Sequence, residues 1–320
     1  MRIKDVAPRA RQVLAEVERA IVGKREVLER IMAACLCPGG HVLLEDYPGL
    51  AKTMIARSFA AALGMRFKRI QFTPDLLPGD ITGGYIYDRN ENRFVLRMGP
   101  VFANVILADE INRASPRTQS ALLEAMQEYQ VTIEGETLPL EEPFIVIATQ
   151  NPIEYEGTFP LPEAQLDRFI VRLSVGYPSA EDEKRILERR QERRTEGVDI
   201  TAVTDCVGMM AMREAVEHVH IDPDLEGYIV DLVGRTRAHR QVVVGASPRG
   251  ALALLKLSRA WAALQGRDYV IPDDIKGFVP AALGHRLMLE PDLWTVKKAP
   301  DAILDEIVKA APVPVTGEQG

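Results

Sequence analysis

The sequence predicts an α/β protein, in which a three-layer αβα core is built around a parallel sheet and a small all-helical domain follows. Three observations indicate this fold. Short apolar runs alternate with helical patterns from about residue 41 to residue 177. Several of these runs are continuously apolar, as are strands buried on both faces of a parallel sheet. After Pro178 nearly every segment has a helical pattern.

The elements follow one another in a simple order. A helical segment covers about residues 8–37, is interrupted near residues 21–24 and is ended by Pro38-Gly39-Gly40. Two further segments, 83–99 and 129–140, have β-like arms around polar turns and are expected to form hairpins inserted into the core. The five expected core strands lie at 41–45, 67–72, 104–109, 144–149 and 169–175.

These elements predict a division into domains. We expect a core over residues 1–178 that carries both hairpins, and a helical linker over 179–220. An all-helical domain is expected over 221–310, and a flexible tail over 311–320.

Composition limits the class of protein. The chain has 320 residues, of which 47% are hydrophobic and 27% charged, as in soluble globular proteins. Its net charge of −7 argues against nucleic acid as the main partner. No run of about 18 apolar residues is present, so no membrane span is expected. The charged N-terminal segment lacks the apolar core of a signal peptide, and we therefore expect a cytoplasmic protein.

The three cysteines suggest no disulfide framework. Cys35 and Cys37 form a C-x-C pair that could be half of a metal site. No second Cys/His cluster accompanies them, so small buried residues near a helix end are the simpler interpretation.

A phosphate-binding loop is predicted between the first strand and the next helix. Such a loop directs backbone N–H groups and a helix N-terminus at an anion. Lys52 would supply a charge to the terminal phosphates, and Thr53 a magnesium ligand. The loop departs from the usual glycine-rich pattern at Asp46 and Ala51. The expected nucleotide-binding residues of this loop are Asp46, Pro48, Gly49, Leu50, Ala51, Lys52 and Thr53.

The two departures differ in weight. Ala51 adds only one methyl group, which fits if the backbone there is near-helical. Asp46 would bring a negative charge close to polyphosphate, and we expect this to weaken ATP binding severalfold. In the alternative interpretation, its carboxylate points away and accepts hydrogen bonds from loop N–H groups, which removes the penalty.

Polar residues also follow two of the later strands. Asp109 and Glu110 end an apolar strand and suit magnesium binding and polarisation of an attacking water. The alternative is an ordinary solvated strand end. Asn151 follows another apolar strand and could hold that water or the terminal phosphate, although Asn-Pro is more often a turn.

Taken together, these motifs resemble a MoxR-type AAA+ ATPase. The matching segments are PGLAKT, ADEINRA, TQSALLEAMQE, ATQNP, LPEAQLDRF and GASPRG, and they occur in the family's order over roughly residues 10–300. Ala51 is the family's usual residue, whereas Asp46 replaces its usual glycine. The resemblance implies that the three-layer core is an AAA+ P-loop core and that the helical domain is its lid.

The resemblance also implies roles for individual residues. Glu110 would be the catalytic glutamate, and Asp109 would support Mg²⁺ together with Thr53. Asn151 would sense the γ-phosphate of ATP. Arg168 would be an arginine finger that reaches a neighbouring subunit's nucleotide, although alone it suggests a surface salt bridge.

The resemblance also implies roles for a lid arginine, for residues near the N-terminus and for the two hairpins. Arg249 would be a second sensor carried by the lid, although a charge at a helix end is equally common. Val22 and Gly23, followed by Lys24, would lie beside the adenine. The two hairpins would face the pore of a ring or a partner surface.

The function implied by the resemblance is chaperone-like remodelling driven by ATP hydrolysis at the interfaces of a homo-oligomer, which would be a hexameric ring. Partners would be a von Willebrand factor A domain protein and a client enzyme or complex. One alternative is a nucleotide-gated scaffold that hydrolyses ATP weakly because of Asp46. The other is a DNA-acting motor, which the acidic balance argues against.

Overall fold

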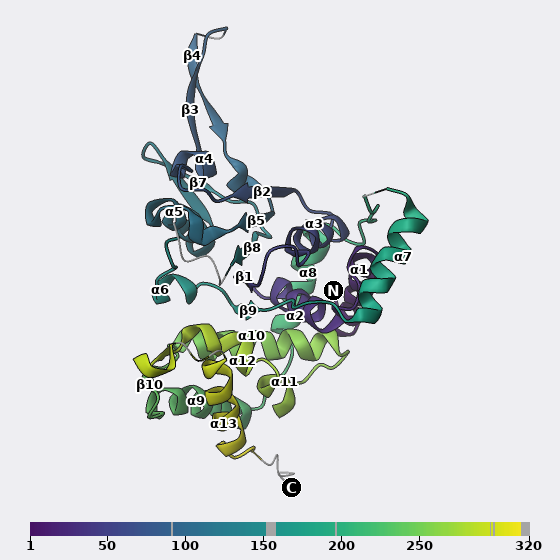
Figure 1. The fold of residues 1–320 in the computed structure, drawn as a ribbon, viewed down its shortest axis with the longest axis vertical. Helices are drawn as coiled ribbons and strands as arrows, with labels where there is room; N and C mark the ends of the chain where they lie inside the picture. Colours follow the sequence, from purple (N-terminus) through teal and green to yellow (C-terminus); the bar gives the residue numbers. More distant parts are fainter. Residues whose placement is uncertain (91, 152–157, 196, 295, 297, 315–320) are drawn as a thin grey trace.

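The computed structural model describes residues 1–90, 92–151, 158–195, 197–294, 296 and 298–314. Its centre is a five-stranded parallel sheet with the strand order β2-β5-β8-β1-β9 (Figure 1). The predicted α/β fold with a parallel sheet is therefore confirmed. The strands are β1 (Val42–Glu45), β2 (Phe67–Gln71), β5 (Val105–Asp109), β8 (Ile145–Gln150) and β9 (Val171–Leu173).

Both faces of this sheet are buried. Leu44 and Leu107 belong to a core cluster that includes residues of α1 (Val6–Ala20), α2 (Arg25–Leu36) and α3 (Lys52–Ala62). Their strand neighbours Leu43 and Ile106 belong to a second cluster on the other face, with α5 (Pro116–Glu128). Because successive side chains of a strand point to opposite faces, burial of both faces produces continuously apolar strands.

Two hairpins lie outside the sheet, over the segments where the sequence predicts them. The first pairs β3 (Gly83–Asp88) with β4 (Arg93–Met98), follows the short helix α4 (Pro78–Thr82) and projects from the body of the molecule (Figure 1). The second pairs β6 (Gln130–Ile133) with β7 (Glu136–Pro139) directly after α5.

The chain after β9 is mainly helical, and residues 223–310 form the lower part of the molecule in Figure 1. The expectation of an all-helical lid is wrong in one detail, because β10 (Val242–Val244) and β11 (Met288–Leu289) form a short antiparallel pair. The helices are α7 (Ala180–Arg193), α8 (Cys206–Glu217), α9 (Pro223–Ala238), α10 (Pro248–Leu264), α11 (Pro272–Lys276), α12 (Val279–Leu283) and α13 (Ala299–Ala310), after the single-turn α6 (Glu163–Leu166) that precedes β9.

One helix of the expected linker packs on the N-terminal helices. Met209 and Met212 of α8 are fully buried in the same cluster as α1 and α2. Arg213 of α8 donates from Nε to the carbonyl of Cys35 at 3.0 Å. Cys35 and Cys37 are buried free thiols, and burial raises the pKa of each to about 12. The C-x-C pair is thus part of the core. No helix within the described ranges is long and apolar enough to cross a membrane.

Candidate functional site

The loop between β1 and α3 has the backbone shape of an anion-binding turn. Gly49 has a φ of +82° and Ala51 a φ of +56°, and α3 begins at Lys52 without a side-chain cap. The uncapped first turn leaves its N–H groups available to an anion. The condition under which the Ala51 methyl group would fit without strain, a near-helical backbone, is not met, since the conformation of Ala51 is left-handed. That conformation costs an L-residue about 1–2 kcal/mol.

The side chain of Asp46 points away from this turn. It is 6% exposed, and its Oδ2 accepts hydrogen bonds from the Ser174 hydroxyl at 3.0 Å, the Gly176 N–H at 2.8 Å and the Val175 N–H. The expectation of a charge facing the phosphates is therefore wrong. The backbone carbonyl of Asp46, in contrast, accepts from Nζ of Lys52. The Asp46 carboxylate thus joins the loop to the segment after β9. The alternative interpretation was right that this carboxylate points away, but its donors belong to residues 174–176 and not to the loop itself.

A cavity of about 310 Å³ lies beside the loop. Gly49, Leu50 and Ala51 line one side of it, and Val22 and Lys24 another. Gly23 lies outside the lining. Its φ is +71°, and an added Cβ would stand 2.2 Å from the carboxyl group of Asp182 in α7, so glycine allows α7 to approach.

Helix α7 closes this cavity, which sequence reasoning did not foresee. Ile186 contributes an apolar surface, and three arginines contribute charge. Nε of Arg193 is buried and has no hydrogen-bond partner among the described residues. From its sequence alone, α7 has the pattern of a charged, solvated helix, because the residues that face the cavity are mostly arginines. The α7 residues that line the cavity are Ile186, Arg189, Arg190 and Arg193.

The acidic pair Asp109 and Glu110 stands at the carboxyl end of β5. This edge of the sheet also carries the loop after β1, and one strand, β8, separates β1 from β5. Two strand spacings place the pair about 10 Å from the loop. Asn151 directly follows β8, between the two, and is 5% exposed. The alternative Asn-Pro turn depends on Pro152, which lies outside the described residues.

Hydrogen bonds hold the acidic pair in place. The Thr149 hydroxyl donates to Oδ1 of Asp109 at 2.7 Å and accepts from the N–H of Glu110 at 2.8 Å. Nη2 of Arg69 lies 2.6 Å from Oδ2 of Asp109, and Nε2 of Gln71 donates to Oε2 of Glu110 at 2.8 Å. Sequence reasoning missed these three partners. The pairing of β2 with β5 brings Arg69 and Gln71 to the acids, and that pairing becomes visible only in the folded sheet.

The acidic pair suits Mg²⁺ bound together with phosphate. The described part of the chain holds no group of three or more His, Cys, Asp or Glu side chains that could by itself bind a metal ion. Mg²⁺ needs only one or two protein carboxylates when phosphate oxygens and water complete its shell. Asp109, at the strand end, and Thr53, in the first turn of α3, fit such a partial shell.

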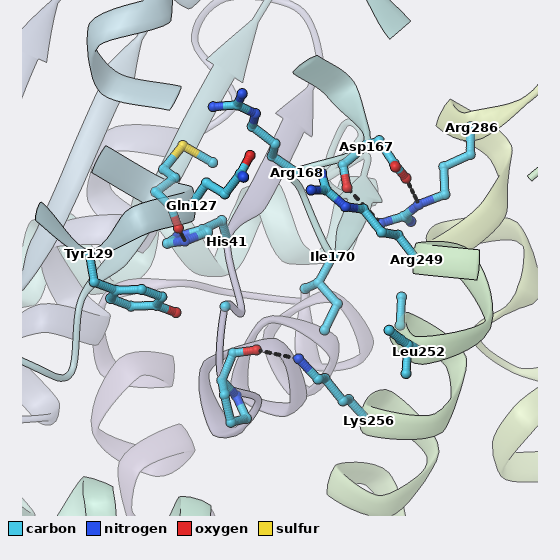
Figure 2. A pocket seen from close by; sticks show the side chains of 14 residues that line it. His41, Gln127, Tyr129, Asp167, Arg168, Ile170, Arg249, Leu252, Lys256 and Arg286 are labelled. Atoms are coloured by element: carbon cyan, nitrogen blue, oxygen red, sulfur yellow. Dashed lines mark hydrogen bonds and ion pairs between the residues drawn. The ribbon is translucent and has the colours of Figure 1, made fainter. Parts of the chain in front are cut away.

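Arg168 and Arg249 line a different cavity, of about 360 Å³ (Figure 2). Its described lining residues are all different from those of the cavity beside the loop. Burial, followed by the charge of Arg249, lowers the pKa of Arg168. Nε of Arg168 is buried without a hydrogen-bond partner in the described structure, which does not fit a simple surface salt bridge.

Arg249 has no evident role in stabilising its own helix. It is exposed and stands in the first turn of α10, where the helix dipole disfavours a cation. The cavity around it also contains Lys256 and Arg286, so it is cationic. Such a cavity suits an anionic ligand.

Comparisons with known proteins agree with this arrangement. Residues 41–171 match the ATPase family associated with various cellular activities (AAA), and residues 234–307 match the AAA lid domain. The chain is 43% identical to Chaperone MoxR1 of Mycobacterium tuberculosis over 95% of its length and 82% of that protein. It is 30% identical to Protein MoxR of Methylorubrum extorquens over 92% of its length and 91% of that protein.

A solved structure supports the same assignment. A proposed ATPase from Cytophaga hutchinsonii superimposes with a TM-score of 0.90 at 38% identity and covers 97% of this chain and 96% of its own. The fold, the loop with its acidic pair and these relatives lead to one conclusion: the chain belongs to the MoxR family of AAA+ ATPases.

Proposed function

We propose that this protein hydrolyses ATP at the interfaces between identical subunits, and that Arg168 and Arg249 of one subunit complete the site of the next. One observation carries the proposal: among the residues that the structure describes, the cavity beside the loop and the cavity that holds the two arginines have no lining residue in common. The arginines are therefore poorly placed to serve the loop of their own chain. A head-to-tail contact that brings one cavity to the other generates a ring when it closes, and we propose a hexamer.

The nucleotide would lie along the loop. Backbone N–H groups of residues 49–53 and the charge of Lys52 would bind its phosphates. Val22, Leu50 and Ile186 offer apolar surface to the base. Mg²⁺, held by Asp109 and Thr53, would neutralise phosphate charge when it is bound.

Glu110 would act as the general base. Its carboxylate would accept a proton from a water molecule as the water oxygen attacks the γ-phosphorus and the bond to the β-phosphate oxygen breaks. Asn151 would orient that water or the γ-phosphate. Gln71 and Arg113 both donate to Oε2 of Glu110 and would orient its carboxylate, so that Oε1 would accept the hydrogen bond from water.

The arginines would act on charge that develops during this step. Nε of Arg168 is buried without a partner among the described residues, and the pKa of Arg168 is lowered chiefly by burial. An anion delivered by the neighbouring subunit would satisfy both Arg168 and Arg249. Because the donors are already aimed at the cavity, they can stabilise the transferring phosphoryl group without reorganisation.

The scaffold alternative loses its main support. It rested on a repulsive carboxylate in the loop, and the Asp46 carboxylate is occupied by Ser174, Val175 and Gly176. We therefore propose full ATPase activity in the assembled state.

The work of the ATPase would be remodelling or maturation of a partner protein. One relative is named a chaperone, and the family resemblance points to a client enzyme or complex and to a von Willebrand factor A domain partner. The β3–β4 hairpin exposes Ile86, Tyr87 and Phe94, which suits contact with protein. The free cysteines agree with a reducing cytoplasm as its location.

Steady-state ATPase rates at several protein concentrations test this proposal. Specific activity should rise with concentration as interfaces form, and DNA should leave it unchanged. The Arg168→Ala and Lys52→Ala variants should each be inactive alone. An equal mixture of the two should recover ATP turnover at hybrid interfaces. Concentration-independent activity, or no recovery at any mixing ratio, would refute the shared site.

A further inference from the structure

The segment that carries Arg168 is tied to the lid by hydrogen bonds whose purpose the proposed function leaves open. Asp167 precedes Arg168, and two lid residues share its carboxylate. Nε of Arg286 donates to Oδ1 at 2.7 Å, and the Ser247 hydroxyl donates to Oδ2 at 3.1 Å. Nη2 of Arg286 also donates to the carbonyl of Phe169 at 2.8 Å. The backbone on both sides of Arg168 is thus anchored to the lid, and Figure 2 shows the contact between Asp167 and Arg286.

The same bonds reach Arg249. Ser247 caps α10, and its hydroxyl oxygen accepts from the N–H of Arg249 at 3.2 Å. Asp167 is therefore bonded covalently to Arg168 and is linked to Arg249 through a single hydroxyl group. The Asp167 carboxylate therefore connects the backbone of Arg168 to the backbone of Arg249.

Electrostatics explains why such a link is needed. Arg168, Arg249, Arg286 and Lys256 all line this cavity, and Asp167 is the only carboxylate among the described residues that line it. The charges of Glu124 and Glu128 in α5, which are not among the lining residues, also act on Arg168. Four like charges repel one another while no anionic ligand is bound. A carboxylate fixed between the core and the lid opposes their separation.

We propose that Asp167, Ser247 and Arg286 form a strut that positions Arg168 and Arg249 as one unit and makes their placement depend on the lid. The proposal rests on the function proposed above. Arg286 is a positioning residue, since its side chain is only 4% exposed and three of its nitrogens are engaged by Asp167, Phe169 and Ala282. A lid movement that breaks the strut would withdraw both arginines from the neighbouring subunit's nucleotide.

Two substitutions break the strut with little change in volume. Ser247→Ala removes the link from Asp167 to α10 and leaves the buried ion pair with Arg286 intact. Asp167→Asn weakens both contacts. For each variant we expect the KM for ATP to stay within twofold of the wild-type value and kcat to fall by about tenfold or more, since small misplacements of catalytic groups have effects of this size. Asp222→Ala, which removes the cap of α9 in the same lid, is the matched control and should retain wild-type kcat.

Mixing experiments distinguish misplaced arginines from a general loss of folding or of ATP binding. Each strut variant keeps its own loop, so mixing it with Lys52→Ala, which keeps its arginines, should recover ATP turnover. Mixing it with Arg168→Ala should recover none, because both partners lack a working donor face. The reference mixture of Arg168→Ala with Lys52→Ala must recover activity in the same assay.

Each outcome decides between the hypotheses. Recovery with Lys52→Ala but not with Arg168→Ala supports the strut. Wild-type turnover of both strut variants, recovery with Arg168→Ala, or recovery with neither partner overturns it while the reference mixture works. A reference mixture without recovery overturns the shared site itself, and the strut with it.

Discussion

Replacing Asp46 with glycine tests whether this residue repels nucleotide or supports the fold. In the structure its carboxylate accepts hydrogen bonds from one hydroxyl and two backbone N–H groups of the segment after β9. Val175 is buried, so its N–H would lose its partner without gaining water. Asp46→Gly should therefore weaken the fold and leave the phosphate-binding groups intact.

The magnitude follows from these bonds. Hydrogen bonds to a charged group contribute about 1.5–3 kcal/mol, and an unpaired buried N–H costs about 1–3 kcal/mol. We expect the free energy of unfolding to fall by about 3 kcal/mol, because the losses overlap and Gly176 is partly solvated. With an unfolding entropy of about 2.1 cal/mol/K per residue, this lowers the Tm by roughly 4 °C for a chain of this length.

Urea unfolding and calorimetric ATP titration of the same preparations measure the two properties separately. Asp46→Asn is the matched control, since it retains one acceptor oxygen and should lose only about 1 kcal/mol. The Kd for ATP should stay within twofold in both variants. An Asp46→Gly variant that unfolds like the wild type and binds ATP several times more tightly would refute this reasoning and restore the view of Asp46 as a brake.

Four further substitutions test the loop and its surroundings. Lys52→Ala should raise the Kd for ATP in calorimetry by at least tenfold, or about 1.4 kcal/mol; an unchanged Kd would mean that the loop is not the site. Glu110→Gln should bind ATP normally but lose about 10²-fold or more in steady-state turnover, because an amide cannot act as a base; wild-type turnover would exclude Glu110 from that role. Ala51→Gly should raise the free energy of unfolding in urea by about 0.5–1 kcal/mol, since glycine adopts the left-handed conformation without strain; a loss of stability would contradict the strain at this residue. Ile186→Asp should raise the Kd for ATP several-fold, whereas its neighbour Leu187→Asp, on a residue outside the cavity lining, should not; equal effects would remove α7 from the nucleotide cavity.

Much of the fold was predictable because burial on both faces leaves a local signal. Four of the five core strands lie within their predicted runs, and β8 extends one residue beyond its run. The inner strands β1, β5 and β8 give the clearest signal, since a strand covered on both faces is apolar at nearly every position. The two hairpins carry polar turn residues between β-like arms, which is also a local signal. The β10–β11 pair left no comparable trace, because its strands have three and two residues and come from segments far apart in the chain.

The sequence by itself determined which groups can do chemistry and their order along the chain: the loop with Lys52, the acids Asp109 and Glu110, and the arginines Arg168 and Arg249. Only the tertiary structure decided where their side chains are directed. It turned Asp46 toward β9, brought α7 over the loop and placed both arginines in a cavity separate from it. The physical reason is that residue type and local pattern follow from short-range preferences, whereas these placements depend on contacts between segments that the chain brings together only when it folds.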